Sequence, residues 1–379
     1  MFPAAPIPMT PDPARADLRE AMALTGSMVA DAVLPCAVLG VADASGIIAI
    51  HAVPGPADRK VAADSVFFLA SLTKPIVATA VMQLVDEGRL DLHLPISRYV
   101  PGYEGGLRDG VTAWHVLTHT SGIPDVDLEH IARGRPSYQT MLDRVRREMP
   151  AFEPGSRYSY ASNSWYLLGA AISTLTGLPF PDALRRRVLG PVGMVDTAFD
   201  PRPTRSRTQQ VHGVRVDNFL AREFMVRFLA SATLPGGGLF GPTEDLLRFG
   251  RALLPRSAAA GPDEVRLLSQ SALDEMTREQ TLGISESLAD GTTREPRYAL
   301  GWHTPGPNVN ESGAPTEVAL HGVRLPASTR SFTHAGASGT RLWVDPDRGL
   351  VFVLLSNQWT GSSIPAIEIL GAVYRGWPG

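Results

Sequence analysis

Residues 68 to 75 read Phe68-Leu69-Ala70-Ser71-Leu72-Thr73-Lys74-Pro75, with a serine three places before a lysine. The lysine is unusual in this chain, because 33 of the 35 basic residues are arginine. A guanidinium keeps its proton at any working pH, whereas an amine with an ordinary pKa of ~10.4 can be shifted until it accepts a proton. The position of Lys74 therefore predicts an amine that acts as a base beside Ser71.

The residues after Lys74 predict a helix that begins near Ser71 and is buried on one face. Its periodic apolar positions are Ile76, Val77, Ala80, Val81 and Leu84. Residues three apart share a helix face, so Lys74 Nζ can reach Ser71 Oγ, and the helix dipole favours an oxyanion at this end. Both effects activate a serine nucleophile. The alternative is a capping serine followed by a surface lysine, but the apolar residues on both sides of the pair argue against it.

Composition excludes several classes of protein. The chain has 379 residues, 44% of them hydrophobic and 19% charged, which is ordinary for a globular protein with a sizeable core. A formal net charge of -3 without a block of like charge gives no case for nucleic-acid binding. The single cysteine rules out an internal disulfide. We see neither a signal peptide nor an apolar run of membrane length, so the sequence predicts a cytoplasmic protein with no membrane partner.

Strand patterns at both ends of the chain predict one antiparallel sheet built from the two termini. Residues 37–42 and 47–52 form a predicted hairpin after a helix at 16–32, and strands at 342–344 and 350–355 precede a helix at 365–374. We expect a mixed α/β fold in which residues 1–74 and 291–379 form a sheet domain. Residues 75–290 form a mainly helical domain, and the proline- and glycine-rich stretches at 201–216, 257–262 and 305–325 are surface loops. The active site is expected in the cleft between the two domains.

Two further segments could carry chemistry. Tyr160 follows a turn-rich stretch just before an apolar helix, and beside a lysine ammonium its hydroxyl could lose a proton well below ~10 and serve as an acid or base. Residues 333–339 are rich in small side chains, so the backbone N–H of Ala337 could approach a substrate carbonyl beside the N–H of Ser71. The alternatives are a structural loop tyrosine and an ordinary glycine-rich strand entry.

Together these segments resemble the serine β-lactamase and penicillin-binding-protein superfamily, in particular its class C β-lactamases, DD-peptidases, D-aminopeptidases and related esterases. Ser71-Leu72-Thr73-Lys74 resembles the family's Ser-x-x-Lys, Tyr160-Ala161-Ser162 its Tyr-x-Asn, and His334-Ala335-Gly336 its Lys/His-Thr/Ala-Gly. Further stretches that look like family landmarks occur in the usual order, at residues 117–124, 190–194, 236–239 and 345–346. The resemblance covers about residues 20–375 and implies the β-lactamase-like fold.

The resemblance implies roles for these residues and a reaction. Ser71 would attack an ester or amide carbonyl, while Lys74 and Tyr160 move its proton. The N–H groups of Ser71 and Ala337 would hold the oxyanion. Ser162, His334, Ala335 and Gly336 would contact the substrate, with neither metal nor organic cofactor. His115 and His119 are four apart, but they lack an acidic partner, so we do not expect a metal site.

Two departures from the family pattern bear on the substrate. Ser162 stands where asparagine grips a substrate amide, and His334 stands where lysine often attracts a substrate carboxylate. The serine weakens the case for β-lactams or peptides, and a neutral histidine suits uncharged esters or amides. We therefore expect a β-lactamase-related carboxylesterase that acts on a small-molecule ester or amide. A β-lactamase, a D-aminopeptidase or DD-peptidase, an acyltransferase and a non-enzymatic, slowly acylating sensor stay open, as do the natural substrate and the oligomeric state.

Overall fold

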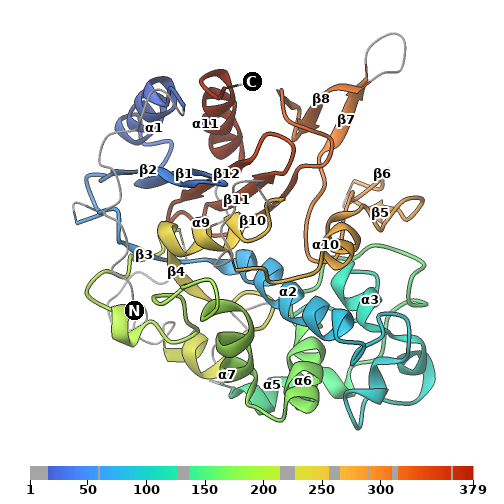
Figure 1. The fold of residues 1–379 in the computed structure, drawn as a ribbon. Coiled ribbons are helices and arrows are strands. Elements are labelled where there is room, and N and C mark those ends of the chain that lie inside the picture. Colours follow the sequence, from blue (N-terminus) through green and yellow to red (C-terminus); the bar gives the residue numbers. More distant parts are fainter. Residues whose placement is uncertain are drawn as a thin grey trace.

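The structure, a computed structural model, describes residues 16–58, 60–126, 136–213, 227–255, 265–288, 290–309, 315–359 and 362–378. Within these ranges the chain forms two layers of helices around a central sheet, with a mainly helical region on one side of it (Figure 1).

The central sheet has five antiparallel strands in the order β10-β11-β12-β1-β2. Their bounds are Phe332–Gly336 for β10, Thr340–Asp345 for β11, Leu350–Leu355 for β12, Ala37–Asp43 for β1 and Gly46–Val53 for β2. The two ends of the chain meet where Val38 of β1 pairs with Leu355 of β12. The predicted mixed α/β fold, with one antiparallel sheet built from both termini, is confirmed.

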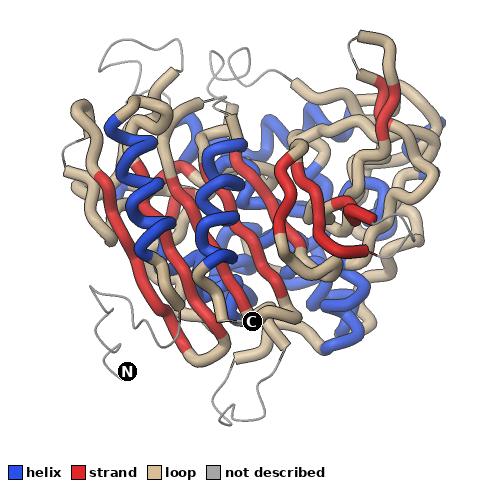
Figure 2. The backbone as a smooth tube through the Cα atoms, turned by 90° about the horizontal axis from the view of Figure 1, so that it is seen from above, coloured by secondary structure: helices blue, strands red, loops and turns tan. Residues whose placement is uncertain are grey.

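Helices cover both faces of this sheet. Helices α1 (Arg19–Ala30) and α11 (Ile364–Arg375) lie side by side across one face, and α9 (Thr243–Arg251) lies against the other (Figures 1 and 2). Because side chains alternate along a strand, β1 and β12 contribute to two separate apolar clusters, one on each face. Gly40 lets α9 approach β1, since a Cβ there would lie 2.4 Å from Thr243 Cγ2.

The remaining helices form the helical region, which contains the buried helix α2 (Thr73–Asp86) directly after the 3₁₀ turn η1 (Ala70–Leu72). The other helices of this region are α3 (Ala113–Leu117), α5 (Tyr138–Arg147), α6 (Trp165–Thr176), α7 (Phe180–Leu184) with the π-helical turn η4 (Arg185–Leu189), and α10 (Gln270–Thr277). Short 3₁₀ turns lie at Ile96–Arg98, Gly106–Gly110 and Arg202–Thr204. Helix α2 packs against α6, α10 and η4, and α6 in turn packs against α3, α5 and α7.

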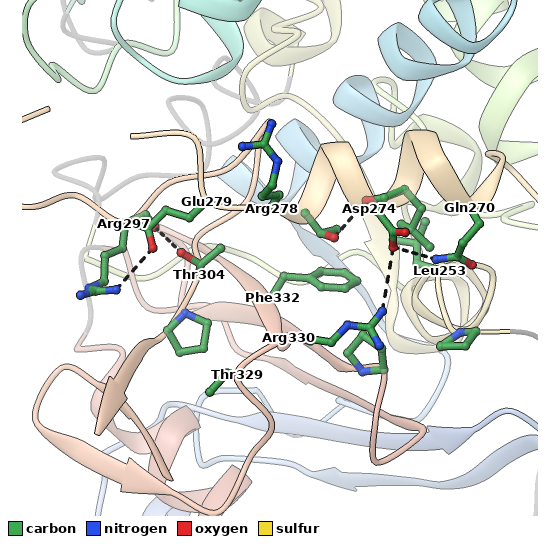
Figure 3. Close-up of a pocket in the computed structure, with 15 residues that line it drawn as sticks. Leu253, Gln270, Asp274, Arg278, Glu279, Arg297, Thr304, Thr329, Arg330 and Phe332 are labelled. Carbon is green, nitrogen blue, oxygen red and sulfur yellow. Dashed lines mark hydrogen bonds and ion pairs between the residues drawn. The ribbon is translucent and has the colours of Figure 1, made fainter. Parts of the chain in front are cut away.

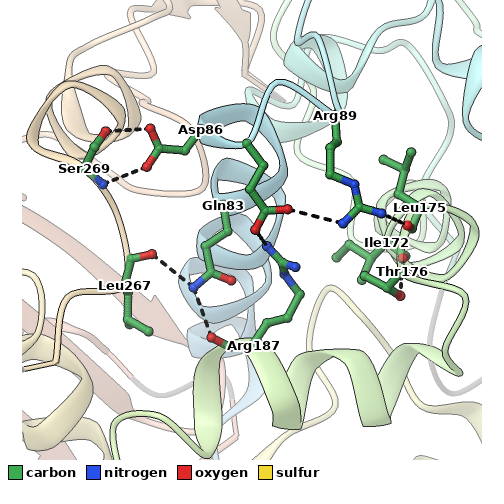
Figure 4. A network of polar contacts seen from close by, with 10 residues as sticks. Gln83, Asp86, Arg89, Ile172, Leu175, Thr176, Arg187, Leu267 and Ser269 are labelled. Atoms are coloured by element: carbon green, nitrogen blue, oxygen red, sulfur yellow. Dashed lines mark hydrogen bonds and ion pairs between the residues drawn. The ribbon is translucent and has the colours of Figure 1, made fainter.

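Polar contacts fix the far end of α2. The Gln83 amide donates to the backbone oxygens of Arg187 and Leu267, each at 3.0 Å, and the Asp86 carboxylate accepts from the backbone and side chain of Ser269 (Figure 4). Glu87 pairs with Arg187. The end of α2 opposite Ser71 is thus tied to η4 and to the start of α10, which holds its axis in place.

Several elements differ from the sequence-based expectations. Residues 305–325, predicted as a loop, contain the three-stranded sheet β7 (Gly306–Val309), β8 (Pro315–Leu320) and β9 (Val323–Leu325). Two short pairs, β3 (Val66–Phe68) with β4 (Phe240–Pro242) and β5 (Glu286–Ser287) with β6 (Thr293–Arg294), were also not predicted. Helix α9 lies within residues 75–290, which we expected to form the helical domain. It packs on β1 and β12, however, and therefore belongs with the sheet.

No single described helix is long and apolar enough to cross a membrane. Helices Trp165–Thr176 and Phe180–Leu189 meet the length and composition criterion only together, across a bend of 76°.

Candidate active site

Ser71 lies in the 3₁₀ turn that opens α2, as the apolar pattern after Lys74 predicts. The preceding residue, Ala70, has a positive φ of 48°, so the chain turns sharply as it enters the helix. Thr73 holds this turn, because its hydroxyl donates to Ala70 O at 2.7 Å and accepts from the backbone N–H of Leu239 at 3.1 Å. The turn exposes Ser71 in part while the next helical turn is buried.

Lys74 is fully buried one helical turn below Ser71. Its Nζ lies 3.3 Å from Ser71 Oγ, 3.0 Å from Ser162 Oγ and 2.6 Å from the carbonyl oxygen of Gly236. A neutral amine has two N–H donors and one lone pair. The Gly236 carbonyl can only accept, so the amine can donate to Gly236 and Ser162 and keep its lone pair for the Ser71 hydroxyl.

Burial changes the proton affinity of this amine. Desolvation lowers the pKa of Lys74 to about 7, and the negative charge of Asp125 opposes part of that shift. The side chain also lies 4.6 Å from the ring centroid of Tyr160. At neutral pH a large fraction of Lys74 is therefore uncharged and able to accept a proton.

Tyr160 brings its hydroxyl to the other side of Ser71 and donates to Ser71 Oγ at 2.9 Å. The sequence argument expected a lowered tyrosine pKa, and the structure differs. Desolvation raises the pKa of Tyr160, more than its hydrogen bonds to Ser71 and Ser162 lower it. The nearby negative charge of Asp125 raises this pKa further. Tyr160 is thus a protonated donor in the resting site.

A cavity of about 290 Å³ opens above Ser71. Tyr160, Ser162 and Ala337 line it together with Ser71. Its other lining residues come from six segments: Phe68, Ala70, Asp125, Val126, Met141, Asn163, Leu234, Gly236, Gly237 and Trp359. The spacing argument and the family resemblance thus pointed to four residues that converge on one cavity.

His334 does not line this cavity; it is 1% exposed and belongs to a buried chain of hydrogen bonds. His334 Nδ1 must donate to Ala335 O at 2.9 Å, so its Nε2 accepts from the Tyr298 hydroxyl, also at 2.9 Å. At the other end, Ala161 N–H donates to His119 Nδ1, which leaves His119 Nε2–H to donate to Tyr298 at 3.2 Å. Each group in this series of hydrogen bonds therefore donates to the next, from Ala161 N–H to Ala335 O.

Both histidines are neutral in this arrangement. Desolvation, together with other nearby cations, holds the pKa of His119 and of His334 well below the usual value of histidine. His119 also packs against the Tyr160 ring, with 4.1 Å between the ring centroids. His334 is accordingly part of the support behind Tyr160. Because it is buried and neutral, it cannot bind the carboxylate of a substrate.

The rest of the third motif supports the nucleophile from behind. A Cβ on Gly336 would lie 2.3 Å from Leu69 O, so glycine lets β10 approach the turn that carries Ser71. Ala335 and Gly336 do not line the cavity, whereas Ala337 does and is exposed. Of the residues assigned to substrate contact, only Ser162 lies in the cavity wall.

Gly236 and Asp125 were missed as site residues by the sequence argument. Gly236 lies in the glycine run at 236–238, which stood out only as a family landmark, and a Cβ there would lie 2.4 Å from Ser162 O. Asp125 follows the His119 segment, and Asn163 N–H donates to its carboxylate at 3.1 Å. Neither stands at a helical spacing from Ser71, so nothing in the local pattern singles them out.

A second cavity, of about 570 Å³, lies between α10 and the start of β10 (Figure 3). It contains none of the predicted site residues, and its three arginines are paired with carboxylates: Arg278 with Glu275, Arg297 with Glu279 and Arg330 with Asp347. No group of three or more potential metal ligands occurs in the described ranges.

Comparisons with known proteins show the family and the fold of the chain. A family model described as Beta-lactamase matches residues 16–370. Esterase EstB of Burkholderia gladioli is 31% identical over 359 residues, covering 84% of each chain. Among solved structures, the fold is similar to EstCE1, "a hydrolase with promiscuous acyltransferase activity", with a TM-score of 0.72 at 19% identity over 94% of this chain and 98% of that one. It is also similar to a penicillin-binding protein homolog from Caulobacter crescentus, with a TM-score of 0.73 at 19% identity over 97% of this chain and 98% of that one. The chain belongs to the beta-lactamase family.

Proposed function

We propose that the protein is a serine carboxylesterase that hydrolyses small esters through an acyl-enzyme on Ser71. The observation that carries the proposal is that Ser71 Oγ contacts both a proton acceptor and a proton donor. The acceptor is the buried amine of Lys74, and the donor is the hydroxyl of Tyr160. The similarity to esterase EstB supports an ester rather than an amide as substrate. So does the cavity, because no arginine or lysine lies in its described lining to hold the carboxylate of a β-lactam or a peptide.

Acylation begins with Lys74. Its lone pair takes the Ser71 proton as Oγ attacks the ester carbonyl, and the N–H groups of Ser71 and Ala337 hold the oxyanion. Tyr160 then gives its proton to the departing alkoxide. Ser162 lies within hydrogen-bond reach of both Lys74 and Tyr160, so it can accept a proton from the ammonium and pass its own to the phenolate.

Deacylation uses the same groups in reverse. A water molecule that attacks the acyl-enzyme loses its proton through Tyr160 and Ser162 to the neutral Lys74 amine. Lys74 then returns a proton to Ser71 Oγ as the acid leaves. In this scheme Ser162 is a proton relay, and the loss of the family's asparagine is no obstacle to turnover.

Covalent labelling tests the nucleophile. A fluorophosphonate should add one label to the wild-type protein, at Ser71, and Ser71→Ala should lose both the label and turnover. Ser121→Ala is the matched control, because Ser121 is a buried serine outside the cavity lining and its loss should leave the label at Ser71 in place. A label on Ser121 or Ser162 would contradict the mechanism.

Substrate choice tests the reaction class. We expect kcat/KM for p-nitrophenyl acetate or butyrate to exceed that for nitrocefin by at least ~10-fold, which is about 1.4 kcal/mol of transition-state discrimination. Faster hydrolysis of nitrocefin or of D-alanyl peptides would make an amidase the better assignment.

A further inference from the structure

The cavity above Ser71 carries one formal charge among its described lining residues, the carboxylate of Asp125. The rest of the wall is polar but uncharged or apolar, with the rings of Phe68 and Trp359 stacked at 6.3 Å between centroids. The amine of Lys74 is fully buried and does not line the cavity. In the described part of the chain, the substrate space is therefore negative.

The Asp125 carboxylate is held by the wall itself. Asn163 N–H donates to its Oδ1 at 3.1 Å, and the Asn163 amide donates to the backbone oxygen of the neighbouring Pro124 at 2.9 Å. These two bonds join the Asp125 segment to the residue that follows Ser162. The carboxylate is thereby fixed beside the reacting groups although its residue is exposed.

The field of this carboxylate reaches the reacting groups. Its charge raises the pKa of Lys74 and that of Tyr160, the two side chains that contact Ser71. A charge that acts on both sides of the nucleophile also acts on a substrate bound between them. The carboxylate attracts a cationic substrate group and repels an anionic one, and water and salt in the open cavity weaken both effects.

We propose that Asp125 is a specificity-determining residue that favours esters carrying a protonated or quaternary ammonium group and disfavours substrates with a carboxylate. The proposal rests on the esterase function proposed above and names its substrate class. The aromatic pair of Phe68 and Trp359 adds to it, because aromatic faces attract ammonium groups. The same charge opposes β-lactams, which carry a carboxylate.

Isosteric ester pairs test the charge preference directly. On the acyl side, p-nitrophenyl 4-(trimethylammonio)butyrate is compared with p-nitrophenyl 5,5-dimethylhexanoate, in which carbon replaces the charged nitrogen. On the alcohol side, acetylcholine is compared with 3,3-dimethylbutyl acetate. The measured quantity is the ratio of kcat/KM for the charged ester to that for its neutral partner, at pH 8, where Lys74 is mostly uncharged.

We expect at least one of the two ratios to fall about tenfold in Asp125→Asn, which keeps the acceptor for Asn163 N–H. The control Asp31→Asn removes the same charge from the exposed end of α1 and should leave both ratios unchanged. In the wild-type enzyme, raising NaCl from 20 to 500 mM should shrink the affected ratio several-fold, which requires no variant to fold.

Two negative outcomes are distinguishable. If the neutral esters are hydrolysed through Ser71 but neither ratio responds to Asp125→Asn or to salt, the charge preference is refuted and the esterase function stands. If no ester is hydrolysed faster than by Ser71→Ala, the esterase function is refuted and the charge preference falls with it.

Discussion

At position 74 an arginine would keep the positive charge but lose the base. We expect Lys74→Arg to lower kcat/KM for p-nitrophenyl butyrate by ~10²-fold or more, nearly as far as Lys74→Ala, because a guanidinium cannot accept the Ser71 proton. Lys60→Arg is the matched control, since Lys60 is the other lysine and is exposed. Retention of most activity by Lys74→Arg would mean that the lysine serves only as a fixed charge.

The same residue predicts the pH dependence. Lys74 must be neutral to act, and burial sets its pKa at about 7, so kcat/KM should fall as pH decreases through about 7. The measurement is kcat/KM for a neutral ester between pH 5 and 9. A profile that is flat across pH 7, or that loses activity as pH rises through 7, would contradict a neutral amine base.

Single residues differ in how well the sequence predicts them. Ser71 and Lys74 could be paired from sequence because one helical turn joins them, and helical spacing is a local property. Asp125 could not be found this way, because its place in the cavity wall depends on contacts with Asn163, 38 positions away. His334 was placed in a motif by resemblance, but its neutral state follows from burial beside Tyr298.

At the scale of elements, the bonds through Tyr298 join the segment after α3, which carries His119, to His334 of β10, and Ala161 N–H connects the Tyr160 loop to His119. Tyr298→Phe would leave His119 and His334 without their shared partner, at a cost of roughly 1–3 kcal/mol for each buried unpaired group. We expect a lower melting temperature and a fall in kcat with little change in KM, because Tyr160 loses the support of His119.

Tyr374→Phe is the matched control for this element. Tyr374 is also buried, donates to Asp345 at 2.7 Å and accepts from Trp343 at 2.9 Å, and it lies in α11, which does not contribute to the cavity lining. It should lower the melting temperature and leave kcat unchanged. An equal loss of kcat in both variants would mean that the Tyr298 hydrogen bonds stabilise the fold in general and do not position Tyr160.

The elements themselves were predictable where they are long and periodic. The predicted boundaries of the terminal hairpin, of α1 and of α11, and the predicted start of α2, lie within a few residues of those observed. The short pair β3 and β4 was missed because three residues carry no periodic signal, and its partner strands are far apart in sequence. The proline and glycine content of residues 305–325 predicts a loop, but edge strands and the first position of a strand also tolerate proline.

At the scale of the whole molecule, the spacing between the sheet and α9 depends on missing side chains at Gly40 of β1 and Gly250 of α9. Gly40→Ala would place a Cβ 2.4 Å from Thr243 Cγ2 and force the layers apart, which typically costs about 1–3 kcal/mol. We expect a lower melting temperature. Gly26→Ala is the control, since a Cβ there meets nothing within 4 Å inside α1 and should stabilise the helix by about 0.5–1 kcal/mol.

The pairing of β1 with β12 also sets an order of events during synthesis. The hairpin of β1 and β2 leaves the ribosome early, but its neighbour β12 and the Ala337 segment are made only near the end of the chain. Chain growth at ~5–20 residues per second then leaves one edge of that hairpin unpaired for tens of seconds. During that time the helical region around α2 can form, whereas the wall opposite Ser71 cannot. We therefore expect that Ser71 of the nascent protein cannot react with an ester until β12 has paired with β1 and the Ala337 segment is in place.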